Sequence, residues 1–229
     1  MKFYAIIVAG GAGKRMQTAV AKQFLLLNEK PVMMHTLQAF YVSEVKPEII
    51  LVLAKADHDY WKELCVKYNF TIPHTLVEGG TERFHSVRNG LMTIKEDGIV
   101  AIHDAVRPVV TASLITQTFK TALEIGNAIP CVKPSDSVRE IQSDGGSKII
   151  NRDKLVLIQT PQTFDLGQLR IAYQQSFSTQ FTDDASVVEA AGFPINLVEG
   201  NRNNIKVTYP EDLELASFLL KNNIPGELF

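Results

Sequence analysis

A glycine-rich segment followed by cations is the first place where this sequence indicates chemistry. Residues 9–16 read Ala-Gly-Gly-Ala-Gly-Lys-Arg-Met, and Lys22 stands seven positions beyond Arg15. A loop with so few Cβ atoms can bring several backbone N–H groups against a phosphate. Two cations near that loop can neutralise the charge that builds on a phosphoryl group and on a pyrophosphate leaving group. The segment predicts a phosphate-binding loop, although the glycines alone are about equally compatible with a structural turn beside solvated Lys14 and Arg15.

Two common phosphate motifs do not fit this segment. A Walker loop requires Ser or Thr after its Gly-Lys pair, but Arg15 stands there, and Val8 occupies the place of the first glycine. The dinucleotide fingerprint requires a third Gly or Ala where Met16 stands. Five histidines and two cysteines are scattered without the spacing of a metal centre or a disulfide framework. Free thiols at Cys65 and Cys131 and a reducing, cytoplasmic location are therefore expected.

Further motifs follow the glycine-rich segment in a definite order. They are Lys22-Gln23-Phe24-Leu25, Gly79-Gly80-Thr81-Glu82-Arg83-Phe84-His85-Ser86-Val87, His103-Asp104-Ala105-Val106-Arg107-Pro108, Thr160-Pro161-Gln162, Thr182-Asp183-Asp184-Ala185 and Asn204-Ile205-Lys206-Val207-Thr208. The first motif, with the glycine segment, resembles the signature of nucleotidyltransferases that join a nucleoside triphosphate to a phosphorylated sugar or polyol. The whole set resembles the 2-C-methyl-D-erythritol 4-phosphate cytidylyltransferase family over essentially the full chain.

The resemblance implies a reaction and a set of residues that would perform it. In that family CTP reacts with 2-C-methyl-D-erythritol 4-phosphate, pyrophosphate leaves, and Mg²⁺ serves as the divalent cofactor, held mainly by the triphosphate. The implied catalytic residues are the cations Arg15, Lys22, Arg152 and Lys206. The implied CTP-binding residues are Ala9, Gly10, Gly11, Gly13, Gly80, Thr81, Ser86 and Ala105. The implied substrate-binding residues are Asp104, Arg107, Ser137, Thr160, Thr182 and Thr208, with Mg²⁺ binding as an alternative role for Asp104.

Local sequence allows more than one role for some of these residues. Gly80, Thr81 and Ser86 stand where a strand is expected to lead into a helix, so they could read the edge of cytosine, but a helix-capping role for Thr81 is equally compatible. We expect Arg83 to brace this loop and His103 to brace the loop after the next strand. The family usually has threonine in place of Ser137, and the serine keeps a hydroxyl there.

The elements that position these residues follow from hydrophobic patterning. Unbroken apolar runs at 3–9, 49–53, 98–102 and 128–132 are typical of strands covered on both faces. Amphipathic segments at 31–42, 57–68, 82–95 and 111–125 separate them, and helices at 166–176, 182–191 and 210–220 with strands at 195–198 and 205–207 complete the chain. The pattern predicts an α/β fold, with a Rossmann-like, mostly parallel sheet flanked by helices in one domain over 1–229. Asp104 would then lie at the carboxyl edge of the sheet, where open α/β folds bind ligands.

A half-polar hairpin is expected between residues 134 and 152. Period-two alternation at 137–141 and 147–150 flanks the turn Ser143-Asp144-Gly145-Gly146. Such a ribbon inserted into a parallel α/β fold cannot bury its second face on its own domain. It is either a solvent-exposed flap or an arm that packs on another subunit, and we favour the arm and hence a homodimer.

Composition limits the partners. The sequence has 229 residues, with 23 Lys plus Arg against 25 Asp plus Glu, so no global positive field exists to hold nucleic acid. The apolar run 3–9 is too short to span a bilayer, and neither a signal segment nor a membrane partner is expected.

Two rival functions stay open. A ribitol 5-phosphate cytidylyltransferase would share the CTP chemistry, and a non-catalytic nucleotide-binding protein would share the fold.

Overall fold

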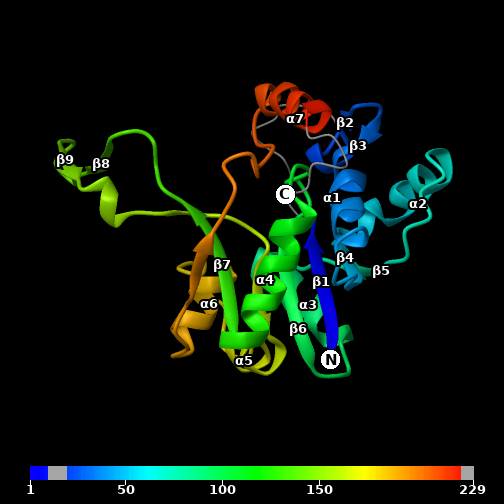
Figure 1. Ribbon diagram of the computed structural model, residues 1–229, viewed down its shortest axis with the longest axis horizontal. Helices are drawn as coiled ribbons and strands as arrows, with labels where there is room; N and C mark the ends of the chain where they lie inside the picture. The colour runs from blue at the N-terminus through cyan, green and yellow to red at the C-terminus, as the bar shows by residue number, and fades with distance from the viewer. Residues whose placement is uncertain (10–19, 223–229) are drawn as a thin grey trace.

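The computed structural model describes residues 1–9 and 20–222 and is built around one large sheet (Figure 1). Within these residues, the strand order is β10-β7-β11-β6-β1-β4-β5, and β12 pairs with β7. The strands are β1 (Lys2–Val8), β4 (Glu48–Leu53), β5 (Thr75–Glu78), β6 (Gly98–Asp104), β7 (Asn127–Val132), β10 (Leu157–Ile158), β11 (Gln162–Asp165) and β12 (Leu197–Glu199). Strands β1, β4, β5 and β6 are mutually parallel, whereas β11 runs antiparallel between β6 and β7. The sheet is therefore mostly parallel, as predicted.

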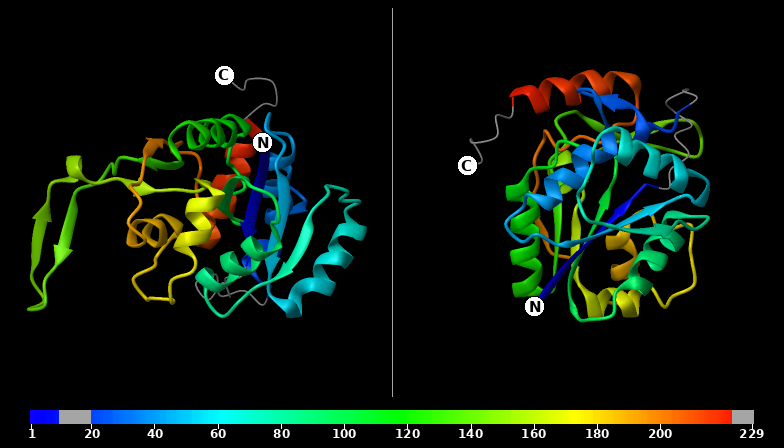
Figure 2. Two further views of the ribbon diagram at one scale, coloured as in Figure 1. Left: turned by 90° about the horizontal axis from the view of Figure 1, so that it is seen from below. Right: turned by 90° about the vertical axis from the view of Figure 1, so that its right-hand side faces the viewer.

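Helices cover both faces of the sheet (Figure 2). Side chains alternate across β1, so that Ala5 and Ile7 join one core layer while Tyr4 and Ile6 join the other. The first layer is completed by α1 (Val32–Tyr41), α2 (His58–Lys67) and α4 (Ala112–Ile125), and the second by α3 (Arg83–Thr93), α5 (Leu166–Ala172) and α6 (Asp184–Ala190). Burial on both faces explains why the strand sequences are unbroken apolar runs.

A smaller third cluster packs beside the carboxyl edge of the sheet. It joins α7 (Pro210–Asn222) to the short hairpin of β2 (Leu26–Leu27) and β3 (Lys30–Pro31) through buried Leu27, Val32 and Ala216. The 3-10 helix η2 (Lys22–Phe24) leads into this hairpin, and two more such helices are η3 (Lys55–Asp57) and η4 (Arg152–Lys154). Val106 and Val207 also belong to the cluster, so it anchors the segments that carry Lys22 and Lys206.

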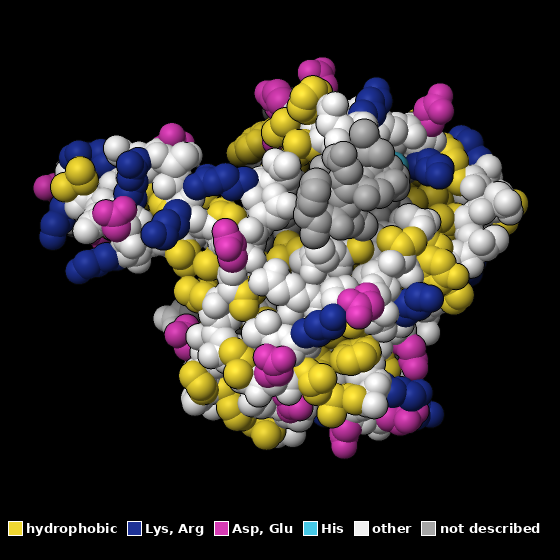
Figure 3. Space-filling model, in the orientation of Figure 1, with side chains coloured by type: hydrophobic (Ala, Val, Ile, Leu, Met, Phe, Trp, Pro, Cys, Tyr) yellow, Lys and Arg dark blue, Asp and Glu magenta, His cyan; other side chains and the backbone are white. Residues whose placement is uncertain are grey.

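The predicted hairpin is present as β8 (Val138–Ile141) and β9 (Ser147–Ile150), paired antiparallel with Val138 opposite Ile150. It projects from the end of β7, well away from the sheet (Figure 1). Ile141 is 84% exposed and Ile149 67% exposed, and the projecting hairpin carries basic and acidic side chains beside hydrophobic ones (Figure 3). We call residues 134–152 the arm. Val138 and Ile150 are partly buried, whereas Ile141 and Ile149 are largely uncovered by the described part of the chain.

One expectation about secondary structure was wrong. The predicted strand at 205–207 does not form: the Val207 N–H donates to the Val106 carbonyl and the Ile205 N–H to the nearby Asn203 carbonyl, and these two bonds do not make a ladder. The antiparallel strand β11 and the edge strand β5 were not expected. Among the described residues, no helix is long and apolar enough to cross a membrane.

Candidate active site

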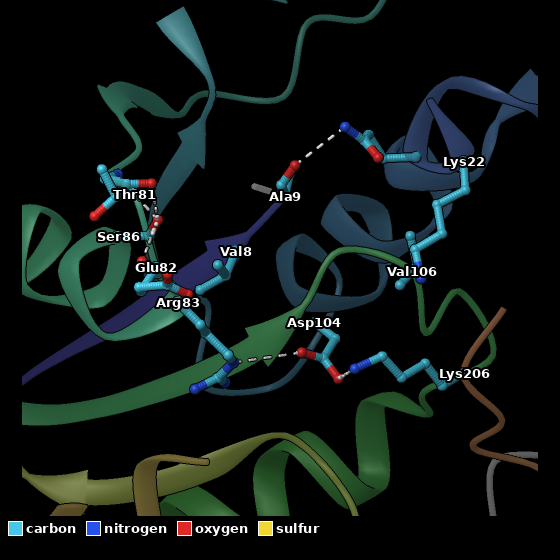
Figure 4. Close-up of a pocket in the computed structure, with 12 residues that line it drawn as sticks. Val8, Ala9, Lys22, Thr81, Glu82, Arg83, Ser86, Asp104, Val106 and Lys206 are labelled. Atoms are coloured by element: carbon cyan, nitrogen blue, oxygen red, sulfur yellow. Dashed lines mark hydrogen bonds and ion pairs between the residues drawn. The ribbon is translucent and has the colours of Figure 1, made fainter. Parts of the chain in front are cut away.

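A cavity of about 260 Å³ opens at the carboxyl edge of β1 and β6 (Figure 4). Its lining comes from five separate segments: the end of β1, helix η2, the loop between β5 and α3, the end of β6, and the extended chain before α7. The lining residues are Val8, Ala9, Lys22, Gln23, Gly80, Thr81, Glu82, Arg83, Ser86, Asp104, Val106 and Lys206. This is the edge at which open α/β sheets bind ligands, because the parallel strands end there together.

Asp104 is the electrostatic centre of the cavity. Its Oδ2 lies 3.0 Å from Lys206 Nζ and 3.3 Å from Arg107 Nε, and its Oδ1 lies 3.8 Å from Arg83 Nε. Burial alone would raise the pKa of the Asp104 carboxyl, but the surrounding Arg83, Lys206 and Arg107 outweigh burial and hold that pKa well below its ordinary value. Asp104 is therefore ionised throughout the physiological range, and it holds three cations at the cavity.

A buried network behind Asp104 fixes its backbone. The Thr160 hydroxyl accepts the Asp104 N–H at 3.2 Å and lies 3.0 Å from His103 Nδ1. His103 Nε2 faces the Arg107 carbonyl at 3.4 Å, and because a carbonyl only accepts, Nε2 carries the proton of the neutral ring and Nδ1 accepts from the Thr160 hydroxyl. Burial lowers the pKa of His103 to about 3, despite the opposing effect of the nearby Asp104 carboxylate. A neutral His103 thus braces the loop after β6, which is the role expected from the sequence.

Arg83 connects the cavity to the second core layer. Its Nη1 and Nη2 donate to the two carboxylate oxygens of Asp184 at 2.7 and 2.6 Å, a bidentate pair in which Asp184 is fully buried. Asp184 is the first residue of α6, and Asp183 caps that helix with a capping box. The pair joins the start of α3 to the start of α6, so Arg83 braces the preceding loop through a second helix.

The loop between β5 and α3 is closed on itself by side chains. The Gly80 N–H donates to Ser86 Oγ at 3.0 Å, and that hydroxyl in turn donates to the Glu82 carbonyl at 3.2 Å. A Cβ at Gly80 would collide with the Cβ of His85, so only glycine fits this close approach. Thr81 is exposed and its hydroxyl lies 3.1 Å from His85 Nδ1. This narrow, glycine-lined wall leaves backbone groups at the cavity surface.

The opposite wall is formed by helix η2. Lys22 is half-buried, and its Nζ donates to the Val207 carbonyl at 3.2 Å. The neighbouring Gln23 is buried and donates from Nε2 to the Ala9 carbonyl at 3.1 Å, which ties η2 to the end of β1. Lys22 and Lys206 therefore come from distant segments to line one cavity (Figure 4).

Comparison with known proteins identifies the family. The family profile described as 2-C-methyl-D-erythritol 4-phosphate cytidylyltransferase matches residues 3–222. The chain belongs to this family. A relative of that name from Bacteroides fragilis is 49% identical over 216 residues, covering 94% of this chain and 98% of the relative. One from Bacteroides thetaiotaomicron is 47% identical over 220 residues, covering 96% and 100%.

Solved structures of the cytidylyltransferase family share the fold. The crystal structure of 4-diphosphocytidyl-2C-methyl-D-erythritol synthase from Anaerococcus prevotii is 30% identical, covers 96% of each chain and has a TM-score of 0.81. The cytidylyltransferase from Thermus thermophilus is 27% identical, with a TM-score of 0.76. The Rossmann-like architecture is thus the architecture of this family.

Several residues that the family resemblance implied do line the cavity, and others support it from behind. Ala9, Lys22, Gly80, Thr81, Ser86, Asp104 and Lys206 line the cavity. Thr160 and Arg107 act on Asp104 instead, and Arg107 also donates from Nη1 to the Asn204 carbonyl at 2.8 Å. Ala105 is fully buried, with its N–H bonded to the Val8 carbonyl and its carbonyl accepting from Thr36. Gly10, Gly11, Gly13 and Arg15 lie outside the described residues.

Four of the implied residues lie away from this cavity. Ser137 and Arg152 belong to the arm, where Arg152 Nη1 donates to the Ser135 carbonyl. Thr182 is exposed just before α6, and Thr208 donates to the Lys206 carbonyl at 3.0 Å. The chain does not bring Arg152 to its own cavity.

Sequence reasoning missed two contributors, Gln23 and the Arg83–Asp184 pair. Gln23 stands inside the Lys-Gln-Phe-Leu motif, and Asp184 stands inside the Thr-Asp-Asp-Ala motif, so both were visible as motif members without a role. The sequence did contain a signal for Asp184, because Asp183 and Asp184 stand at the start of an otherwise apolar helix. A carboxylate that becomes buried there requires a cation or several hydrogen-bond donors as partners.

The described residues offer few ligands for a divalent cation at the cavity. Within the described residues, no group of three or more His, Cys, Asp or Glu side chains could hold a metal. Asp104 offers one carboxylate oxygen, Oδ1, that receives no hydrogen bond from the described chain. One carboxylate oxygen fits Mg²⁺ that takes its other ligands from substrate phosphates and water, and it does not fit a metal held by protein alone.

Proposed function

We propose that this protein transfers the cytidylyl group of CTP to 2-C-methyl-D-erythritol 4-phosphate and releases pyrophosphate. The observation that carries the proposal is one cavity with two unlike walls in a member of the cytidylyltransferase family. The loop of Gly80 and Thr81 offers backbone groups on one wall, while Lys22 and Lys206 offer positive charge on the other. A pyrimidine base suits the first wall and a triphosphate suits the second.

The transfer requires alignment and charge neutralisation more than acid–base chemistry. An oxygen of the polyol phosphate attacks the α-phosphorus of CTP, a new P–O bond forms, and the bond to the oxygen bridging the α- and β-phosphorus breaks. The electron pair leaves on pyrophosphate. Since the attacking phosphate is already anionic at neutral pH, no activated serine and no general base is needed. Lys22 and Lys206 would stabilise the negative charge as it shifts toward the leaving group.

Asp104 has a positioning task in this scheme. Its carboxylate holds Lys206 at 3.0 Å and Arg107 at 3.3 Å, so these cations are ordered before substrate arrives. Preorganised charges cost no reorganisation when the phosphoryl group reacts. If Mg²⁺ is bound, Asp104 Oδ1 and the triphosphate oxygens would hold it, and it would neutralise part of the phosphate charge.

We also propose that the protein forms a homodimer through the arm. Ile141 and Ile149 are largely exposed on a two-stranded ribbon, and such ribbons are marginal in water on their own. Pairing with a second copy would cover them. Arg152 and Ser137 would then serve the neighbouring subunit's polyol phosphate site, which accounts for their distance from the cavity of their own chain. A cytoplasmic location is proposed from the two free cysteines, Cys65 and Cys131.

Pyrophosphate release by the purified protein tests the function. Each of the four nucleoside triphosphates is combined with 2-C-methyl-D-erythritol 4-phosphate or ribitol 5-phosphate in the presence of Mg²⁺. We expect release with CTP and the methylerythritol substrate to exceed every other pair by at least about a hundredfold, because a site built to hydrogen-bond one base rejects the others strongly. Preference for ribitol 5-phosphate, equal use of ATP or GTP, or no release with any pair would overturn the proposal.

A further inference from the structure

Tyr173 makes a charge-assisted hydrogen bond although it lies outside the cavity. It directly follows α5, is 4% exposed, and does not line the cavity. Its hydroxyl donates to Asp184 Oδ1 at 2.6 Å. A hydrogen bond from a neutral hydroxyl to a buried carboxylate is about twice as strong as one between neutral groups, so this bond fixes the carboxylate of Asp184 firmly.

The same carboxylate holds the guanidinium of Arg83. Arg83 Nη1 shares Oδ1 of Asp184 with the Tyr173 hydroxyl, at 2.7 Å, and Nη2 takes Oδ2 at 2.6 Å. The ring of Tyr173 also stacks on Phe84, with centroids 4.8 Å apart and planes 20° from parallel. Because Phe84 follows Arg83 in α3, Tyr173 contacts the start of that helix by two independent routes.

Arg83 stands between two carboxylates that compete for it. One is Asp184, which is fully buried, and the other is Asp104 in the cavity, whose Oδ1 lies 3.8 Å from Arg83 Nε. A small rotation of the Arg83 side chain would bring it into hydrogen-bond distance of Oδ1. That rotation would cover Oδ1, because Arg83 and Lys206 approach the Asp104 carboxylate from opposite sides (Figure 4).

We infer that Tyr173 is a positioning residue for nucleotide binding, because its hydroxyl fixes the Asp184 carboxylate, which holds Arg83 in a bidentate pair and leaves its Nε beyond hydrogen-bond distance of Asp104 Oδ1. The inference rests on the proposed function, since it assigns the cavity wall beside Arg83 to CTP. The residue does not touch substrate. It acts on the cavity wall through two intervening side chains, Asp184 and Arg83.

The first test removes only the hydroxyl. Tyr173→Phe keeps the ring and its stacking on Phe84, and Tyr4→Phe is the matched control. Tyr4 is also 4% exposed, and its hydroxyl makes no hydrogen bond within the described residues. We expect Tyr173→Phe to raise the KM for CTP about tenfold, because losing the hydrogen bond to Asp184 releases Arg83 beside the proposed CTP site, with kcat and the KM for the polyol phosphate changed less than about twofold. Tyr4→Phe should leave all three constants within about twofold.

A double-mutant cycle separates positioning from packing. Arg83→Lys retains the charge opposite Asp184 but loses the bidentate geometry. If Tyr173 acts through Arg83, Tyr173→Phe should have less than about a twofold effect on the KM for CTP in the Arg83→Lys background. A full tenfold effect in that background would show that the two residues act independently, and it would overturn the inference.

A measurement without substrate keeps the two proposals distinguishable. In the ligand-free protein, ¹⁵N NMR of the Arg83 guanidinium reports whether rotation about its Cζ–Nη bonds is hindered. We expect hindered rotation in the wild type and in Tyr4→Phe, and faster rotation in Tyr173→Phe. Unchanged Arg83 signals in Tyr173→Phe would overturn the inference even if CTP turnover is normal. Absence of turnover in the wild type would overturn the proposed function. The NMR comparison of Arg83 would then still decide whether Tyr173 positions that side chain.

Discussion

Replacing Asp104 by asparagine should lower the stability of the ligand-free protein far more than a single carboxylate change on the surface. The substitution preserves shape and removes the charge that Arg83, Arg107 and Lys206 share. The side chains of Asp104 and Arg107 are each only 12% exposed, so their pair is largely buried. Lys206 is 41% exposed, so solvent screens its ion pair with Asp104 and that pair adds little to the free energy of unfolding.

The size of the effect follows from the buried pair. Removing one partner of a buried ion pair costs about 3–5 kcal/mol, and we expect the lower end, about 3 kcal/mol, because the asparagine carbonyl can still accept one hydrogen bond. For a chain of this length, 1 kcal/mol corresponds to roughly 2–4 °C in Tm, so the variant should melt about 6–12 °C below the wild type. The control is Glu44→Gln, which breaks the exposed pair with Lys120 at 2.9 Å and should shift Tm by less than about 3 °C.

The pH dependence gives the prediction a sign. The native pKa of Asp104 is depressed, so the unfolded chain binds a proton here at a higher pH than the folded chain does. The stability supplied by its charge is therefore fully present above the unfolded pKa of about 3.9 and is lost as pH falls toward the native value. Differential scanning fluorimetry should show a constant gap between wild type and Asp104→Asn from about pH 8 to pH 5, narrowing below. A gap at pH 7 no larger than that of Glu44→Gln would refute the reasoning.

Three further outcomes are expected. Lys22→Ala should lower kcat at least about a hundredfold with a smaller change in substrate affinity, measured by pyrophosphate release beside circular dichroism, and near-normal kcat would remove its catalytic role. Gly80→Ala should raise the KM for CTP at least about tenfold, because the new Cβ collides with His85. The control Gly79→Ala, whose Cβ meets Ser86 Oγ at 3.4 Å, should change that KM less than about threefold. Equal effects of the two variants would contradict the loop geometry. Replacing residues 139–148 by a short Gly-Ser turn should give a folded, weakly active monomer in sedimentation, and a dimer of full activity would show that the arm is only a flap.

Hydrophobic patterning predicted the central strands because burial on both faces leaves an unbroken apolar run. Strand β1 shows the reason, since Ala5 and Tyr4 face different core layers and neither side is polar. The same logic failed for β11, where Gln162 and Thr163 are buried and the side-chain amide of Gln162 bonds to Asp183. Buried polar residues do not produce an apolar run, so hydrophobic patterning does not reveal such a strand.

The error at 205–207 has the opposite cause. Ile205, Lys206 and Val207 alternate as a half-buried strand would, because Val207 packs in the cluster with α7 while Lys206 points to the cavity. Alternation thus reports burial on one side and not a hydrogen-bonded ladder. The motifs likewise contain residues that line the cavity, but they did not indicate that Arg83 would brace its loop by pairing with Asp184. That pairing depends on how α3 and α6 pack, which no local pattern records.

The cavity's ion pairs also constrain how the protein reaches its native state. Arg83 and Asp184 are 101 positions apart, and the bond from Arg107 to the Asn204 carbonyl spans 97 positions. Closing such long loops costs chain entropy before the contacts compensate for it, and the sheet itself pairs β1 with β6 across a similar separation. Helices should therefore form early during refolding, while the charges around Asp104 come together only when the chain is nearly native. Recovery of activity would then report completion of the fold as a whole, and a partly folded chain would carry every catalytic side chain without a working site.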